Sequence, residues 1–235
     1  MKSLSNNMQL KNKTALITGS SRGVGQQIAL GLAGEGCDII VHARNIDHCQ
    51  EMLEKLKSYD VKTYSVAGDL SQESGVKHLI EQVDNLSVPV DILYNNAGIM
   101  VAYKEDIWSH TTEDFMQSYQ VNVVAPYKLC AAFVPAMIDR GYGRVVNLTS
   151  RIDGIPELAP YGATKWAIDK LSMDLATKLQ DTNVRLNYLD PTWLKTDMGG
   201  DQALNEVEAV LPGALEPVLI DNDGPNGQFF QALKN

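Results

Sequence analysis

The stretch from Thr14 to Gly25 reads TALITGSSRGVG. Its first five residues are apolar or β-branched, which predicts a short buried strand. Three glycines follow, at Gly19, Gly23 and Gly25, and residues 25–34 then show the pattern of a helix. Glycines at such a position permit a tight turn and a close approach of the backbone to a pyrophosphate. The stretch therefore predicts a dinucleotide-binding turn, with a plain strand-to-helix turn as the alternative.

Strand and helix patterns alternate along most of the remaining chain. Six more strands are predicted by short apolar runs, at 38–42, 62–67, 91–94, 144–148, 184–189 and 227–230. Helical patterns separate most of them, at 46–59, around 76–83, from a capping box at 111–114 to residue 136, and at 168–179. Apolar strands that alternate with helices are typical of a parallel sheet covered on both faces. We therefore predict an α/β fold with three layers and a doubly wound, seven-stranded parallel sheet.

Length and composition fit one large domain. The chain has 235 residues, of which 44% are hydrophobic and 21% charged, enough for a sizeable core. We expect a single domain over residues 1–235, with residues 1–11 as a flexible extension. The net charge of −9 argues against non-specific binding to nucleic acid or to an anionic membrane surface. No run of 18 apolar residues predicts a membrane span, and the first residues lack the apolar segment of a secretory signal.

The spacing of cysteines and histidines indicates the redox state of the cellular compartment and whether a metal site is expected. Three cysteines without CxxC spacing (Cys37, Cys49 and Cys130) predict reduced, buried thiols in a cytoplasmic protein. The four histidines show no metal-binding spacing, and we predict no metal site.

The end of the second predicted strand indicates the type of dinucleotide. An acidic residue there would bind the ribose 2′-hydroxyl of NAD. The sequence instead reads His42-Ala43-Arg44-Asn45. Arg44, assisted by Arg22 of the glycine-rich turn, could pair with a 2′-phosphate through charge-assisted hydrogen bonds. The pattern favours NADP(H), with two ordinary surface cations as the alternative.

Two further strand ends carry residues that suit a cofactor. Asp69 and Leu70 follow the third strand. An aspartate there could bind the adenine amino group or cap the next helix. Asn96, Ala97 and Gly98 follow the fourth strand. Small residues there would let the backbone approach the cofactor, unless they form an ordinary turn.

Residues 161–165 read Tyr-Gly-Ala-Thr-Lys. A tyrosine and a lysine four residues apart lie one above the other on a helix face. An ammonium beside a phenol favours the phenolate and lowers the phenol pKa from about 10. The pair is therefore a candidate proton-transfer site, although this spacing also arises by chance on amphipathic helices.

Taken in order, these motifs resemble the short-chain dehydrogenase/reductase family over about residues 10–230. The resemblance rests on TGSSRGVG, Asp69-Leu70, NNAG, Asn122, Ser150, YGATK and Pro191…Thr196. It implies a Rossmann-type sheet with the active site at the carboxyl ends of the strands. It also implies an NADP-preferring enzyme with features of carbonyl reductases and of 3-oxoacyl-carrier-protein reductases.

The resemblance implies four catalytic residues. Tyr161 would be the general acid/base, and Lys165 would lower its pKa and hold the nicotinamide ribose. Ser150 would bond the substrate carbonyl, with Thr149 as the neighbouring candidate. Asn122 would support a water that links Lys165 to solvent. An ordinary helix kink before Pro126 is the alternative role for Asn122.

The resemblance also implies a set of cofactor-binding residues. Thr196 among them would bind the carboxamide. The set is Gly19, Ser21, Arg22, Gly23, Val24, Gly25, Arg44, Asn45, Asp69, Leu70, Asn96, Ala97, Gly98, Tyr161, Lys165, Pro191, Thr192, Leu194, Thr196 and Met198.

The sequence departs from the family pattern at two places. Thr192 follows Pro191 where the family usually has glycine, and its Cβ could narrow the nicotinamide pocket. The loop from Ser150 to Tyr161 is about two residues shorter than the common form, which we expect to alter the local substrate geometry but not the presence of the catalytic set. Residues 99–108, 153–158 and 193–215 would line the substrate pocket or pack on one another.

We therefore expect an NADP(H)-dependent oxidoreductase that reduces a small-molecule carbonyl or oxidises the alcohol. A 3-oxoacyl-carrier-protein reductase is the alternative, with a local basic patch at Lys128, Arg140, Arg144 and Arg151. A non-catalytic dinucleotide sensor is a third interpretation. Apolar stripes on the helices at 112–137 and 161–180 predict a homodimer or homotetramer, unless those stripes only cover the sheet.

Overall fold

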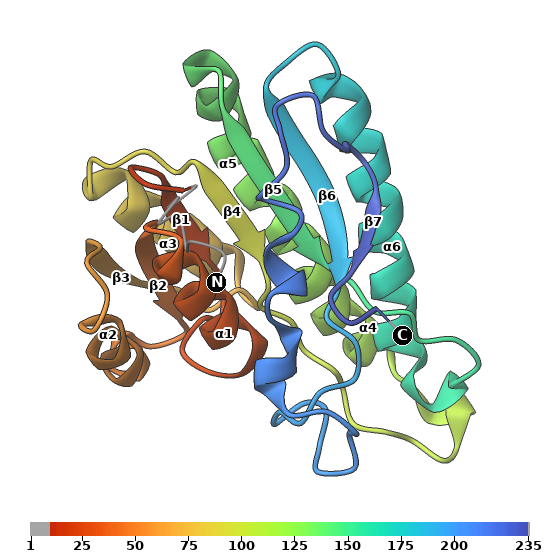
Figure 1. Ribbon diagram of the computed structural model, residues 1–235. Coiled ribbons are helices and arrows are strands. Elements are labelled where there is room, and N and C mark those ends of the chain that lie inside the picture. Colours follow the sequence, from red (N-terminus) through yellow and green to blue (C-terminus); the bar gives the residue numbers. More distant parts are fainter. Residues whose placement is uncertain (1–9, 235) are drawn as a thin grey trace.

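A single parallel sheet organises the fold (Figure 1). The computed structural model describes residues 10–234. Within them, seven strands pair in the order β3-β2-β1-β4-β5-β6-β7, and each pair is parallel. The strands are β1 (Thr14–Ile17), β2 (Asp38–Ala43), β3 (Thr63–Ala67), β4 (Ile92–Asn95), β5 (Gly143–Leu148), β6 (Val184–Asp190) and β7 (Phe229–Gln231). The predicted seven-stranded parallel sheet is confirmed.

Helices cover both faces of this sheet. They are α1 (Gly23–Gly34), α2 (Gln50–Leu56), α3 (Glu73–Asn85), α4 (Thr112–Tyr119), α5 (Ala125–Arg140) and α6 (Ala159–Ala176). Successive strand residues point to opposite faces. Ile17 thus packs in the cluster that contains α1 and α2, whereas Leu16 packs in the cluster that contains α3 and α5. The three predicted layers follow from this alternation.

The strand order reverses between β1 and β4. β1 continues to β2 and β3 on one side, and the chain then returns to place β4 on the other side of β1. Ligands of doubly wound sheets bind in the crevice at such a reversal, outside the carboxyl ends of the strands. Those ends face the lower part of Figure 1, where the loops that follow β4, β5 and β6 meet.

The long helix predicted from 111 to 136 is interrupted. A π-helical turn, Gln120–Val124, separates α4 from α5. Pro126 has no N–H, so the backbone carbonyl of Asn122 has no i+4 partner at this point. The N–H of Ala125 bonds the carbonyl of Gln120 instead. The capping box at Thr111 and Asp114 is present as predicted.

Other boundaries differ from the prediction by a few residues. The helix at 46–59 is a 3₁₀ turn, Ile46–Cys49, followed by α2, which ends at Leu56. The last strand begins at Phe229 rather than at 227, because Gly227 has φ +69° and cannot continue a strand. Helix α6 begins at Ala159 and therefore includes Tyr161 and Lys165.

Leu10, at the start of the described residues, and the apolar stretch Thr112–Arg140 are both part of the fold. Leu10 is buried, and its N–H bonds the carbonyl of Glu35. Leu10 is therefore part of the fold rather than of the predicted flexible extension, and residues 1–9 lie outside the described residues. By length and composition alone, the continuous stretch Thr112–Arg140 could cross a membrane. In the fold it covers one face of the sheet, with Leu129 and Met137 fully buried.

Candidate active site

The glycine-rich turn is fixed by hydrogen bonds to the segment after β4. Thr18 Oγ1 accepts the N–H groups of Asn96 and Ala97, both at 3.0 Å. Asn96 Nδ2 donates to the carbonyls of Thr18 at 2.8 Å and of Gly19 at 3.2 Å. The two sequence motifs on either side of the strand reversal thus form one rigid unit.

His42 ties this turn to the ends of β2 and β3. Its Nδ1 accepts the N–H of Gly19 at 3.0 Å, and its Nε2 lies 3.0 Å from the carbonyl oxygen of Gly68. These partners fix the neutral tautomer that carries its proton on Nε2. Burial lowers the pKa of His42 to about 4, while the bond to Gly68 acts in the opposite direction. His42 is therefore a structural residue of the turn.

The glycines of the turn fit a backbone that lies against a ligand. A Cβ on Gly25 would lie 2.4 Å from the carbonyl oxygen of Gly19, so that position tolerates no side chain. Gly23 has φ +60°, and a Cβ there would lie 3.7 Å from Thr196 Cγ2. Helix α1 has no side-chain cap and no acidic residue in its first turn. Its N-terminus is thus suited to an anion such as a pyrophosphate, held between the turn and Thr196.

A cleft lies beyond the ends of β2 and β3, where the sequence predicts contacts with an adenosine. Its volume is about 530 Å³, and it is lined by residues of both strand ends and of α3, among them Arg44, Asn45, Asp69 and His78. Asp69 Oδ1 accepts the N–H of Ser71, so its side chain shapes the turn before α3. Asn45 caps the 3₁₀ turn that follows β2. Arg44 is exposed in this cleft.

Arg22 does not join Arg44 at this cleft. Its Nη1 lies 3.1 Å from Asp197 Oδ2, and both side chains are exposed. The ion pair connects the glycine-rich turn with the segment after β6. That Arg22 assists a 2′-phosphate stays a prediction, and such a contact would require Arg22 to leave Asp197.

Tyr161 and Lys165 lie on the same face of α6, as their spacing predicts. Both are buried, with 9% and 6% of their surfaces exposed. Lys165 Nζ lies 5.4 Å from the centre of the Tyr161 ring and donates to the carbonyl of Leu148 at 2.9 Å. A Cβ on Gly98 would lie 3.7 Å from the same Nζ. The NNAG motif and the YGATK motif therefore meet at one point.

The pKa values of the pair differ from the sequence prediction. Burial raises the pKa of Tyr161 to about 12, Ser150 lowers it by a hydrogen bond, and the charge of Asp190 raises it. Burial also lowers the pKa of Lys165 to about 8, against the charges of Asp169 and Asp190. In this structure burial is the largest influence on the Tyr161 pKa, and Lys165 is not among the groups that shift it.

Ser150, rather than Thr149, lies beside the phenol. Ser150 lowers the pKa of Tyr161, whereas Thr149 has no such effect on it. Thr149 is buried, and its Oγ1 donates to the backbone carbonyl of Lys165 at 3.2 Å. The hydroxyl of Thr149 is therefore bound to the backbone of α6, whereas the hydroxyl of Ser150 is the candidate for contact with a substrate.

Asn122 links the segment after β4 to α6. Its Oδ1 accepts the N–H of Ile99, and its Nδ2 donates to the carbonyl of Ile99, both at 2.9 Å. Nδ2 also donates to Thr164 Oγ1 at 3.0 Å, and Thr164 donates to the carbonyl of Tyr161. Asn122 thus lies in the interrupted part of the helix before Pro126 and also contacts α6 at the site. From the sequence alone these two placements are alternatives.

Several predicted residues lie away from the crevice or have other partners. Leu194 is buried in the core cluster of α1, so its side chain does not face a cofactor. The expected basic patch is not formed, because Arg144 is buried and bonds four oxygens near the amino end of β5. Arg140 pairs with Asp91, and Arg151 pairs with Asp169. Of the four side chains of the expected patch, only that of Lys128 has neither a hydrogen bond nor an ion pair among the described residues.

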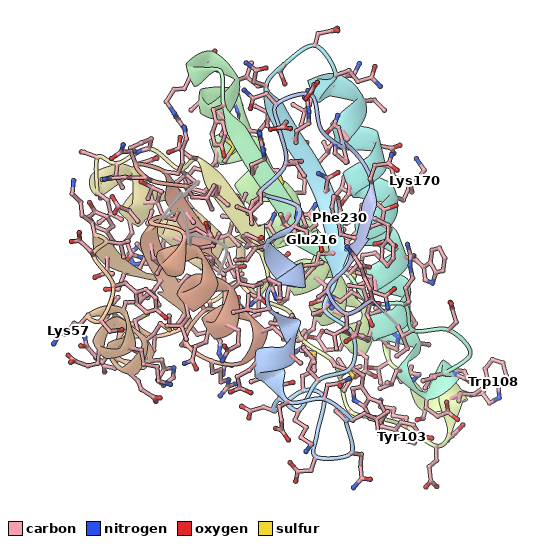
Figure 2. All side chains as sticks on the ribbon, in the orientation of Figure 1. Lys57, Tyr103, Trp108, Lys170, Glu216 and Phe230 are labelled. Carbon is pink, nitrogen blue, oxygen red and sulfur yellow. The ribbon has the colours of Figure 1, made fainter. Side chains whose placement is uncertain are left out.

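The loops predicted to line the substrate pocket lie at the same end of the sheet. The N–H of Lys104 bonds the carbonyl of Glu157, so residues 99–108 contact residues 153–158. Tyr103 and Trp108 nevertheless point away from the body of the protein (Figure 2). Val210 and Leu215 are buried in the cluster of α1. That part of the 193–215 segment belongs to the core rather than to the pocket.

Three residues at the site were missed in the sequence. Asp190 ends β6 and is buried, Asp169 lies four residues after Lys165, and Thr164 lies between Tyr161 and Lys165. An acid that ends a strand at the carboxyl edge was the available signal for Asp190. The i, i+4 spacing was the signal for Asp169. Within residues 10–234, no three His, Cys, Asp or Glu side chains are placed to hold a metal ion.

Comparisons with known proteins agree with this geometry. The family model described as short chain dehydrogenase matches residues 13–207. An uncharacterized oxidoreductase of Bacillus subtilis is 33% identical over 79% of this chain and 71% of its own length. A 3-oxoacyl-[acyl-carrier-protein] reductase of Staphylococcus epidermidis is 31% identical over 80% of this chain and 77% of its own length.

A solved structure matches almost the entire chain. The 3-oxoacyl (acyl-carrier-protein) reductase of Agrobacterium tumefaciens C58, with NADP bound, is 27% identical with a TM-score of 0.87, over 98% of this chain and 96% of that one. The family model covers most of the chain, and the similarity to this solved structure extends over nearly all of the parallel-sheet fold. The chain belongs to the short-chain dehydrogenase family of oxidoreductases.

Proposed function

We propose that the protein is an NADP(H)-dependent oxidoreductase that reduces a carbonyl to an alcohol, or catalyses the reverse. The observation that carries the proposal is the arrangement of three side chains around one point. Ser150 lies near enough to the Tyr161 phenol to lower its pKa, and the ammonium of Lys165 lies 5.4 Å from the centre of the Tyr161 ring. Tyr161 is the general acid/base in this proposal.

Ser150, Tyr161 and Lys165 each have a separate role in the proposed carbonyl reduction. A bound nicotinamide supplies the hydride. Ser150 donates a hydrogen bond to the carbonyl oxygen and stabilises the negative charge that develops there. Tyr161, with a pKa of about 12, is protonated at neutral pH and delivers the proton. Lys165, with a pKa of about 8, is mostly charged at neutral pH and stabilises the phenolate left behind.

Arg44 supports NADP(H) as the cofactor. The strand that precedes it ends without an acidic residue, and Arg44 lies in the cleft beyond β2 and β3. A similar solved structure holds NADP. Asn45 and Asp69 complete the proposed contacts with the adenosine, and Thr196 faces the glycine-rich turn from the other side.

A screen of carbonyl substrates with NADPH and NADH in parallel tests the proposal. The panel contains aliphatic and aromatic ketones, an acetoacetyl thioester and 5-ketogluconate, because some relatives are named for acyl-carrier-protein or gluconate substrates. We expect oxidation of NADPH with at least one ketone and weaker activity with NADH. No turnover of any carbonyl, together with no binding of either dinucleotide, would contradict the proposal.

Reduction of a 3-oxoacyl chain carried by a protein is the second candidate. The similarity to 3-oxoacyl-[acyl-carrier-protein] reductases favours it. Carrier proteins are acidic, however, and this chain has a net charge of −9 without the expected basic patch. We therefore rank a small carbonyl substrate higher. A non-catalytic sensor ranks below both, because the catalytic side chains are all present.

We also propose that the protein acts in the cytoplasm as a homodimer or homotetramer. Its three cysteines are free and buried, as expected in a reducing compartment. Large apolar side chains are exposed on neighbouring helices, at Met116 on α4, Tyr127 on α5, and Trp166 and Met173 on α6. Sedimentation at low concentration that shows only a 25.8 kDa species would contradict the oligomer.

A further inference from the structure

Asp190 is a buried carboxylate at the edge of the active site. It ends β6, and only 5% of its surface is exposed. None of the ion pairs found within residues 10–234 includes it. A buried carboxylate without a paired cation is unfavourable unless hydrogen bonds compensate for the lost water. The partners of Asp190 therefore indicate what it does.

Both carboxylate oxygens of Asp190 accept backbone N–H groups, and the two donors come from different loops. Oδ2 accepts the N–H of Arg151 at 3.1 Å, directly after Ser150. Oδ1 accepts the N–H of Thr192 at 2.8 Å, in the segment that continues to Thr196. One side chain thus joins the loop of the proposed oxyanion donor to the loop proposed to face the nicotinamide.

The bond to Thr192 holds an unfavourable backbone conformation. Thr192 has φ +70°, in the left-handed region that β-branched residues rarely adopt. Its Oγ1 is buried and has no hydrogen-bond partner in the described structure. Glycine at this position would adopt the conformation without cost. The Asp190 carboxylate therefore stabilises a turn that the local sequence disfavours.

The other donor, Arg151, is held at its side chain as well. Its Nη1 lies 2.7 Å from Asp169 Oδ2, and its guanidinium carbon lies 4.1 Å from the centre of the Phe229 ring. With its N–H on Asp190, Arg151 is fixed at both ends. Because Ser150 directly precedes Arg151, these contacts also restrict the position of Ser150.

We propose that Asp190 is a positioning residue that holds Ser150 and the Pro191–Thr192 segment in a fixed mutual arrangement. The inference rests on the proposed function, because it gives that arrangement a catalytic purpose. Misplacement of a reacting group by about 1 Å can cost a hundredfold in rate.

The charge of Asp190 has a second consequence, which supplies an independent readout. It raises the pKa of Tyr161 and of Lys165. The charge of Asp190 acts on Tyr161 and Lys165 from α6. Arg151, from the loop after β5, donates its N–H to the carboxylate and pairs through its side chain with Asp169 of α6. Loss of the Asp190 charge should therefore move the alkaline limb of the kcat profile, where Tyr161 loses its proton, to lower pH.

The experiment compares Asp190→Ala and Asp190→Asn with wild type, with Asp181→Asn as the control for loss of an exposed acid. Hydrogen exchange is followed in peptides that cover 149–155 and 190–196. We expect exchange at least about tenfold faster in both peptides for Asp190→Ala, since each N–H loses its acceptor. We expect kcat about tenfold lower, an alkaline limb at lower pH for Asp190→Asn, and no change for Asp181→Asn.

Thr192→Gly keeps the proposal testable if Asp190→Ala does not fold. Glycine adopts the left-handed turn unaided, so the double variant with Asp190→Ala should fold. It should show fast exchange at 149–155, because the N–H of Arg151 has lost its acceptor. Unchanged exchange in the 149–155 peptide, or an unchanged pH profile, would overturn the proposal. Hydrogen exchange needs no substrate. If the wild type reduced no carbonyl, the proposed function would be refuted, but the exchange data would still show whether Asp190 holds the two segments.

Discussion

Replacement of Arg44 by alanine should change the choice of cofactor. Arg44 follows β2, lines the cleft with Asn45 and Asp69, and takes part in none of the ion pairs found within residues 10–234. Arg22, the other cation expected there, pairs with Asp197. The variant therefore removes the arginine that the structure leaves for a 2′-phosphate.

The size of the effect follows from the exposure of Arg44. A hydrogen bond to a charged group contributes about 1.5–3 kcal/mol, and an exposed pair lies near the lower end of that range. A loss near 1.4 kcal/mol is a factor of about ten in affinity. We therefore expect the Kd of NADPH to rise about 10- to 30-fold in Arg44→Ala, and the Kd of NADH to change less than about twofold.

Fluorescence titration of both dinucleotides measures the four Kd values. Lys57→Ala is the matched control, because Lys57 is an exposed cation on the nearby α2 segment that pairs with Glu54 (Figure 2). It should leave both dinucleotides unaffected. An equal loss of NADPH and NADH affinity in Arg44→Ala, or no loss at all, would refute the role of Arg44. So would a wild type that binds NADH more tightly.

Three further predictions concern the glycine-rich turn and its neighbours. Gly25→Ala places a Cβ 2.4 Å from the carbonyl oxygen of Gly19 and should lower the free energy of unfolding by about 1–3 kcal/mol. Gly34→Ala, with a contact no closer than 3.9 Å, is its control in urea denaturation. His42 has a folded pKa of about 4 against an ordinary 6.5. Its contribution to stability is therefore complete above pH 6.5 and falls by about 3 kcal/mol toward pH 4, and denaturation across that range should show less slope in a His42→Gln variant. Thr192→Gly relieves a left-handed residue and should raise the free energy of unfolding by about 1 kcal/mol; a lower melting temperature would contradict that strain.

Much of the fold could be predicted because each element carries its own local signal. The first strand, the glycine-rich turn and the alternation of strands with helices imply a parallel sheet covered on both faces. The interruption of the long helix had a signal in Pro126, but a sequence does not tell a kink from a π turn. In the structure the turn also carries Asn122, whose side chain bonds Ile99 from another segment.

The residues that sequence reasoning misplaced depend on distant partners. The partner of Arg22 was not evident from the sequence, because Asp197, with which it pairs, lies far away in the sequence. The side chain of Leu194 is buried because residues 207–215 return to α1. Asp190 acquires its role only when the loops after β5 and β6 are adjacent. Motif spacing located the chemistry, whereas contacts between distant segments determined which charges are free to take part.

The most direct test of the central claim is the turnover of Tyr161→Phe. The substitution removes one hydroxyl from a buried ring and leaves the ring packing in place. We predict that NADPH binds with a Kd within about twofold of wild type, while carbonyl reduction falls by at least about a hundredfold, the contribution of general acid catalysis. Turnover equal to wild type on the same substrates would contradict the assignment of Tyr161 as the proton donor.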